Sequence, residues 1–95
     1  MPRLAFPAKP LSDRLPTKAR VLGVWVDNMA KAYPESAFGA NRQRVEDTLG
    51  EKKIVIEYNP QTKSMRVAHA EEGVQWMYSL WFAWHALRPS TEVFE

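Results

Sequence analysis

The stretch Val74–Leu87 reads VQWMYSLWFAWHAL, and it does most to decide the predicted fold. Its apolar residues recur at the i, i+3, i+4, i+7 spacing of a helix with one buried side. That stripe consists of Met77, Leu80, Trp81, Trp84 and Leu87. Arg88-Pro89 follows, and a proline just beyond the last turn is a common helix stop. We therefore predict one helix over residues 74–87 that is apolar nearly all round and covered on more than one side.

The rest of the chain is dominated by strand signals. Lys53–Tyr58 alternates apolar and polar residues, with Ile54, Ile56 and Tyr58 on one face. Asn59–Lys63 is a turn, and Ser64–Ala70 is its partner strand. On that strand we expect three residues to alternate inward: Met65, Val67 and His69.

A second hairpin is predicted earlier in the chain. Val21–Val26 is rich in β-branched residues, Asp27-Asn28 tolerates a tight turn, and Met29–Tyr33 returns to Pro34. Gln43–Leu49 fits either a short strand or a helical turn. The predicted fold class is α+β: a small antiparallel meander of about four strands packed against one C-terminal helix.

Length and proline content predict the domain organisation. The chain has 95 residues, enough for one core. Residues 1–19 contain four of the seven prolines, which favours an irregular N-terminal arm. We predict this arm followed by a single α+β domain over residues 20–95, with Val93 and Phe94 packing back onto it.

Charge and length argue against two classes of partner. The net charge is only +2, and the basic residues of the first twenty positions form no dense run. A solvated tail explains them better than a nucleic-acid site does. The apolar stretch of 14 residues would span about 21 Å, shorter than a bilayer core. We predict neither nucleic-acid binding nor a membrane span.

No arrangement of residues predicts catalysis, a cofactor or a metal. The chain has no cysteine, so it has no disulfide and no thiolate ligand. Its two histidines, His69 and His85, show no ligand spacing with Glu71 or Glu72. No Gly-x-Ser-x-Gly elbow is present. We predict no catalytic, cofactor-binding or metal-binding residue, and the sequence leans towards a non-enzymatic protein.

The aromatic residues suggest two hypotheses about function, beside the simpler interpretation that all of them pack in one core. Trp76 and Tyr78 lie off the main stripe, and exposed aromatic residues mark interfaces. The first hypothesis is a binding or assembly module that docks a protein partner or another copy of itself through this surface. The alternative is a small exported ligand-binding or enzymatic domain with a pocket between sheet and helix, near Tyr33, Tyr58 and His85.

Several short motifs occur together in a recognisable order. They are Val21-Leu22-Gly23-Val24, Ala30-Lys31-Ala32-Tyr33-Pro34, Glu46-Asp47-Thr48-Leu49-Gly50 before Ile54–Tyr58, and Trp81…Trp84…Arg88-Pro89-Ser90-Thr91-Glu92-Val93. Over about residues 20–94 the chain resembles the bacterial family called domain of unknown function 3179. Members of that family often appear exported, so the resemblance implies a periplasmic or exported location, although this chain shows no signal peptide.

The chain departs from the family pattern at one turn. Members have Tyr-Cys-Pro-x-Cys-Gly-Ser where this chain has Tyr58-Asn59-Pro60-Gln61-Thr62-Lys63-Ser64. Any thiol, metal or redox role of that turn is therefore excluded here. The segment between the turn and the final helix is also shorter than in the family, so the chain resembles a short, divergent member.

Overall fold

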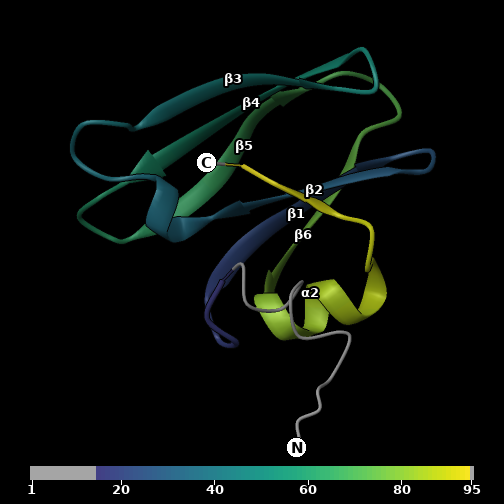
Figure 1. Cartoon of the computed structure of the whole chain (residues 1–95). Coiled ribbons are helices and arrows are strands. Elements are labelled where there is room, and N and C mark those ends of the chain that lie inside the picture. The colour runs from purple at the N-terminus through teal and green to yellow at the C-terminus, as the bar shows by residue number, and fades with distance from the viewer. Residues whose placement is uncertain (1–14, 95) are drawn as a thin grey trace, which may run out of the picture.

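The computed structural model describes residues 15–94. Over these residues the protein consists of two β-sheets, formed mostly by antiparallel strands, and one short helix (Figure 1). The elements are β1 (Arg20–Val26), β2 (Met29–Pro34), the 3-10 turn η1 (Glu35–Ala37), β3 (Arg44–Leu49), β4 (Lys52–Asn59), β5 (Ser64–Ala70), β6 (Gln75–Leu80), α2 (Trp81–Leu87) and β7 (Glu92–Val93). Most of the predicted N-terminal arm lies in residues 1–14, outside the described residues. The predicted α+β class is confirmed.

The strands form a four-stranded sheet of order β6-β1-β2-β7 and a three-stranded sheet of order β3-β4-β5. The predicted β1–β2 hairpin is confirmed, with Val26 opposite Met29 and Asp27 at a positive φ of 53°. The two sheets together contain four and three strands, more than the predicted total of about four. The ambiguous segment 43–49 forms β3, and the C-terminal tail adds β7 in parallel beside β2.

The predicted helix over 74–87 is wrong in its first half. Residues 75–80 form β6, which pairs with β1 from Trp25↔Gln75 to Arg20↔Leu80, and the helix begins only at Trp81. Alternate residues of this segment are hydrogen-bonded to the neighbouring β1, and tertiary pairing of this kind overrides a helical pattern. Of the predicted stripe, Trp81 and Trp84 are buried, whereas Met77, Leu80 and Leu87 are exposed.

The predicted inward position of His69 is also wrong. Met65 is buried and Val67 is half-buried, but His69 is exposed. The register of β4 against β5 shifts between Val55 and Ile56, where Val67 and His69 face consecutive residues of β4. This bulge breaks the two-residue alternation, so the strand's later residues change face.

One hydrophobic core lies between the two sheets. It is lined by alternate residues of β1 and by residues of β2 to β5. Its buried members are Leu22, Val24, Val26, Tyr33, Phe38, Val45, Leu49, Ile54, Ile56, Met65 and Val74. Phe94, from the tail, packs against this core, as predicted.

A second core lies on the opposite face of the four-stranded sheet, beneath α2 (Figure 1). Trp81 and Trp84 are fully buried there against β1, so this tryptophan pair covers that face of the sheet. Gly23 makes the contact possible, because a Cβ at this position would lie 2.3 Å from the Trp84 ring. The Trp84 Nε1 donates a hydrogen bond of 2.9 Å to Thr91 Oγ1, which ties the tail to the helix. The molecule therefore has three layers: sheet, sheet and helix.

Candidate functional site

Strand β6 lies at the edge of the four-stranded sheet and pairs, among the residues that the structure describes, with β1 alone. Five of its six residues are exposed. The side chains of Trp76 and Tyr78 are 42% and 57% exposed, so the structure places both on the surface of the same strand. An exposed apolar edge strand presents unpaired backbone groups to which another strand can bind.

The β6 edge carries none of the features that usually protect such a strand. Residues 73–87 include no Asp, Glu, Lys, Arg or Pro. The edge strands of the three-stranded sheet differ, since β5 exposes Arg66 and β3 exposes Arg44 and Glu46. At the other edge of the four-stranded sheet, β7 has only two residues. Charged residues and short length discourage unwanted pairing at these edges. Within the described chain, only the edge strand β6 has neither form of protection.

The position of the Tyr78 ring is fixed by the second sheet. Its hydroxyl donates a hydrogen bond of 2.9 Å to the backbone oxygen of Met65 on β5. A cavity of about 430 Å³ lies beside it, with Arg20, Lys63 and Ser79 in its lining. Tyr78 is therefore exposed on one side and held at its tip, a geometry that limits the rotamer entropy lost on binding.

Four further exposed apolar residues, which the helical pattern of the sequence does not predict to be exposed, surround this edge. Met77 and Leu80 on β6, and Phe82 and Leu87 on α2, are all exposed. Met77, Leu80 and Leu87 belong to the predicted buried stripe, which extends one helical spacing over a segment whose first half is a strand, and Phe82 lies outside that stripe. Trp76, Tyr78 and Leu80 recur at every second residue with Gln75 and Ser79 at alternate positions, and this partial alternation, which Met77 interrupts, is the one local signal for the strand.

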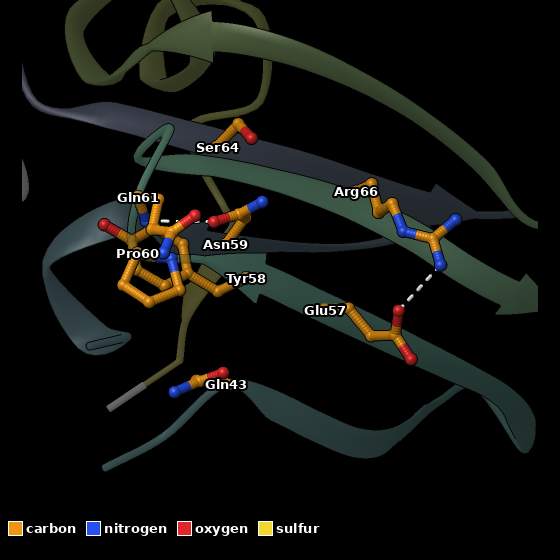
Figure 2. Close-up of a pocket in the computed structure, with 8 residues that line it drawn as sticks. All are labelled: Gln43, Glu57, Tyr58, Asn59, Pro60, Gln61, Ser64 and Arg66. Carbon is orange, nitrogen blue, oxygen red and sulfur yellow. Dashed lines mark hydrogen bonds and ion pairs between the residues drawn. The ribbon is translucent and has the colours of Figure 1, made fainter. Parts of the chain in front are cut away.

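A polar groove of about 580 Å³ lies over the β4–β5 hairpin. Figure 2 shows Tyr58, Asn59, Pro60 and Gln61 gathered at the turn, with the paired Glu57 and Arg66 farther along the strands. Asn59 Oδ1 accepts a hydrogen bond of 2.9 Å from the backbone N–H of Gln61, which shapes the turn.

The charges of this groove are already satisfied within the protein. Glu57 accepts bonds of 2.8 Å from Arg44 and 2.7 Å from Arg66. Asn59, Gln61 and Arg66 are exposed. The groove therefore offers a ligand few free charged groups and little burial, and it is a weaker candidate than the β6 edge.

A partly buried polar cluster joins the two sheets. Lys31 Nζ on β2 and the Tyr33 hydroxyl donate to Asp47 Oδ2 on β3, at 2.8 Å and 2.9 Å. Burial alone would raise the pKa of the Asp47 carboxyl, but hydrogen bonds from Lys31, the Thr48 backbone and Tyr33 outweigh it and lower this pKa. Burial, followed by the bond to Asp47, raises the pKa of Tyr33 above its usual range. A tyrosine held neutral in this way is a structural donor, and the cluster acts as a cross-sheet link.

The three residues of the predicted pocket belong to different parts of the molecule. Tyr33 is buried in the core between the sheets, and Tyr58 packs at its edge, with its ring 5.7 Å from that of Phe38. His85 lies on α2, where its ring is 5.4 Å from that of Trp81. Of the three residues, only Tyr58 lines the polar groove.

The remaining predictions about chemistry concern metals and membranes. His85 Nε2 is buried and has no hydrogen-bond partner within the described part of the chain. Residues 15–94 contain no group of three or more His, Cys, Asp or Glu residues that could hold a metal ion. Over the same residues, no helix has the length and apolar character needed to cross a membrane.

Comparison with known proteins identifies the family but no individual relative. The family model described as "Protein of unknown function (DUF3179)" matches residues 1–78, which is most of the chain. The closing tryptophan motif of α2 lies beyond the matched residues. No curated protein and no solved structure shows a match. The chain is therefore a member of the DUF3179 family of proteins of unknown function.

Proposed function

We propose that this chain is a non-enzymatic binding or assembly module that docks a protein partner by strand addition at the β6 edge. The observation that carries the proposal is the uncharged, exposed edge strand bearing Trp76 and Tyr78. In strand addition, backbone hydrogen bonds supply affinity and the alternate side chains supply specificity. Both are present on β6.

The sequence-based alternative, a ligand-binding or enzymatic pocket near Tyr33, Tyr58 and His85, has less support. Tyr33 is fully buried and its hydroxyl is engaged by Asp47. His85 lies on α2, which packs against the face of the four-stranded sheet opposite the inter-sheet core. A small-molecule site usually needs convergent polar groups in a concave pocket, and these residues do not converge.

The proposal can be tested without knowing the partner, by selecting binders from a library of random extended peptides on the immobilised full chain. We expect selected peptides to be uncharged and rich in β-branched and aromatic residues. Methylating alternate backbone nitrogens of a selected peptide should abolish binding, because strand addition requires those donors. Affinity that survives this methylation, or a selection that yields no binder, would show that the edge does not act by strand addition.

A pair of double variants provides the matched control. Trp76→Lys with Tyr78→Lys places two charges on the β6 edge and should remove peptide binding. Thr62→Lys with Ala68→Lys adds the same charge at exposed positions of the other sheet and should leave binding unchanged. Equal loss in both variants would point to charge alone and contradict the proposal.

A further inference from the structure

The hydrogen-bond pattern of β1 and β6 identifies the backbone groups that face outward. The ladder between these strands extends to Trp81, whose N–H donates to Ala19 O at 2.8 Å. In an antiparallel ladder every second residue turns its N–H and C=O towards the same neighbour. Counting back from Trp81, the residues that turn away from β1 are Leu80, Tyr78 and Trp76. Their outer N–H groups have no backbone acceptor among the described residues.

The geometry points to a second copy of this chain as the occupant of the edge, an inference that rests on the proposed function. The two β6 strands pair antiparallel about a two-fold axis perpendicular to the sheet, with Tyr78 opposite Tyr78 and Trp76 opposite Leu80. Such an axis keeps the inner face of each strand on the same side. In this register the two Tyr78 residues exchange a pair of hydrogen bonds, and each Leu80 N–H meets the C=O of the other strand's Trp76. The Leu80 C=O takes no part, because it starts α2 and accepts from Ser79 Oγ at 3.0 Å.

Other registers bring fewer of these outward residues opposite one another. A shift by one residue brings outward groups against residues that are already bonded to β1, so their donors stay unpaired. A shift that places Trp76 opposite Tyr78 pairs only those two residues of each strand, and leaves Leu80 opposite Val74, outside β6. The register centred on Tyr78 is therefore the one that keeps all three outward residues of each strand within the pair, and we choose it on that ground.

The side chains of this register are complementary to themselves. Trp76, Tyr78 and Leu80 share one face of β6, since they pair with alternate residues of β1. Aromatic and aliphatic side chains directly opposite one another stabilise antiparallel pairs. Residues 73–87 contain no Asp, Glu, Lys or Arg, so two copies meet without charge repulsion along the strand. The same lack of charge provides no electrostatic selection for a different partner.

The first experiment measures solution mass of the full chain by sedimentation equilibrium as concentration rises. We expect the mass to increase from the 10.9 kDa of one chain to twice that value. Tyr78→Lys alone and Tyr78→Glu alone should each raise the dissociation constant at least tenfold, because like charges meet on the two-fold axis. An equimolar mixture of the two variants should regain the dimer. Ala68→Lys is the matched control and should behave like the unaltered chain.

The charge-swap result depends on residue 78 facing its own counterpart, so it tests the register as well as the interface. A dimer that persists in Tyr78→Lys, or a mixture that fails to associate, would overturn the inference. Far-UV circular dichroism and urea unfolding confirm that the variants fold. Because Tyr78 is more than half exposed, we expect unchanged spectra, and because its hydroxyl donates to Met65 O, we expect the urea midpoints to fall moderately without loss of the fold.

A covalent trap gives a second, independent measurement. The chain has no cysteine, so Tyr78→Cys introduces its only thiol. Opposed residues of a hydrogen-bonded antiparallel pair have Cα atoms about 5.5 Å apart, a separation that suits a disulfide. Mild oxidation should give a disulfide-linked dimer with Tyr78→Cys but little with Thr62→Cys, and equal yields would contradict the register.

Failure of this inference can be told from failure of the proposed function. A chain that stays monomeric at about 1 mM and still selects extended peptides would disprove self-pairing and leave strand addition in place. A monomer that selects no peptide would disprove both. In a monomer, slow hydrogen exchange at the Trp76, Tyr78 and Leu80 amides would show that the chain covers its own edge, and that result would also overturn the inference.

Discussion

The two sheets of this protein are stabilised in different ways. The four-stranded sheet is covered on both faces, by the inter-sheet core and by α2, and its central strand β1 is almost wholly buried. The three-stranded sheet contributes to one core only, and its surface carries the ion pairs of Glu57 with Arg44 and Arg66. Apolar packing dominates the first sheet, and the second combines one core face with a charged surface.

This difference explains why the unprotected edge lies in the first sheet. The buried strand β1 and the helix α2 both require apolar neighbours, and β6 pairs with β1 and continues directly into α2. The charged surface of the second sheet keeps its own edges from pairing. The predictions below test this contrast between the sheets, from the largest expected effect to the smallest.

The doubly covered sheet should be most sensitive at Gly23. In Gly23→Ala the new methyl group would lie 2.3 Å from the buried Trp84 ring, and neither β1 nor α2 can move far. Overpacking of this severity should cost about 3 kcal/mol of the free energy of unfolding, measured in urea. Gly39→Ala, where nothing lies within 4 Å, is the control and should change stability by less than about 0.5 kcal/mol. Similar losses in the two variants would contradict the tight contact.

The link between the sheets should depend on pH. Asp47→Asn removes the carboxylate that accepts from Lys31 and Tyr33 and should cost about 2 kcal/mol at pH 7. The pKa of Asp47 is lowered in the folded state, so the stability that it contributes is present above the unfolded value of about 4 and is lost as the pH falls through the folded value.

The acid side of the stability curve checks this linkage. Urea unfolding between pH 2 and 7 should show that the free energy of unfolding falls less on acidification for Asp47→Asn than for the unaltered chain. Glu57→Gln, on the exposed surface of the same sheet, serves as the carboxylate control and should keep most of the acid dependence. Parallel curves for Asp47→Asn and the unaltered chain would rule out the link.

The buried hydrogen bond between α2 and the tail, beside the first sheet, should have an intermediate effect. Thr91→Val keeps the size of the side chain but leaves the Trp84 Nε1 donor without its acceptor at 2.9 Å. An unsatisfied buried donor should cost about 1.5 kcal/mol, seen as a lower thermal midpoint. Thr91→Ser, which keeps the hydroxyl, should recover part of that loss. A midpoint unchanged in Thr91→Val would show that the tail does not fix the helix.

The charged surface of the second sheet should show the smallest effect. Arg66→Ala removes an ion pair of 2.7 Å whose arginine side chain is mostly exposed. Exposed pairs contribute about 0.5 kcal/mol, and 1 M salt should erase the difference between variant and unaltered chain. A loss above about 2 kcal/mol, or one that salt leaves unchanged, would contradict the contrast between the two sheets.

Much of the strand structure could be predicted because the local signals agree with the fold. The alternation of Lys53–Tyr58 and the turn at Asn59–Lys63 identified β4 and β5, and the Asp27-Asn28 turn identified the first hairpin. In these segments, side-chain alternation and turn chemistry act over a few residues. These local signals therefore predict strands and turns without any knowledge of the tertiary packing.

The segment 74–87 could not be predicted from local signals alone. Its apolar spacing fits a helix throughout, but the backbone of 75–80 pairs with β1, a contact some fifty residues away in sequence. The cross-sheet link of Lys31, Tyr33 and Asp47 was missed for the same reason, since its members come from two sheets. Trp76 and Tyr78 were predicted to lie off the buried stripe, and they are exposed, although on a strand and not a helix.

The placement of the tryptophans means that tryptophan fluorescence reports on only one of the two sheets. All four, Trp25, Trp76, Trp81 and Trp84, belong to the four-stranded sheet or to α2, and β3 to β5 contain none. Intrinsic tryptophan emission will therefore change when that sheet and its helix unfold and will change little when the other sheet unfolds. If the two sheets separate before they unfold, emission and far-UV circular dichroism will give different midpoints.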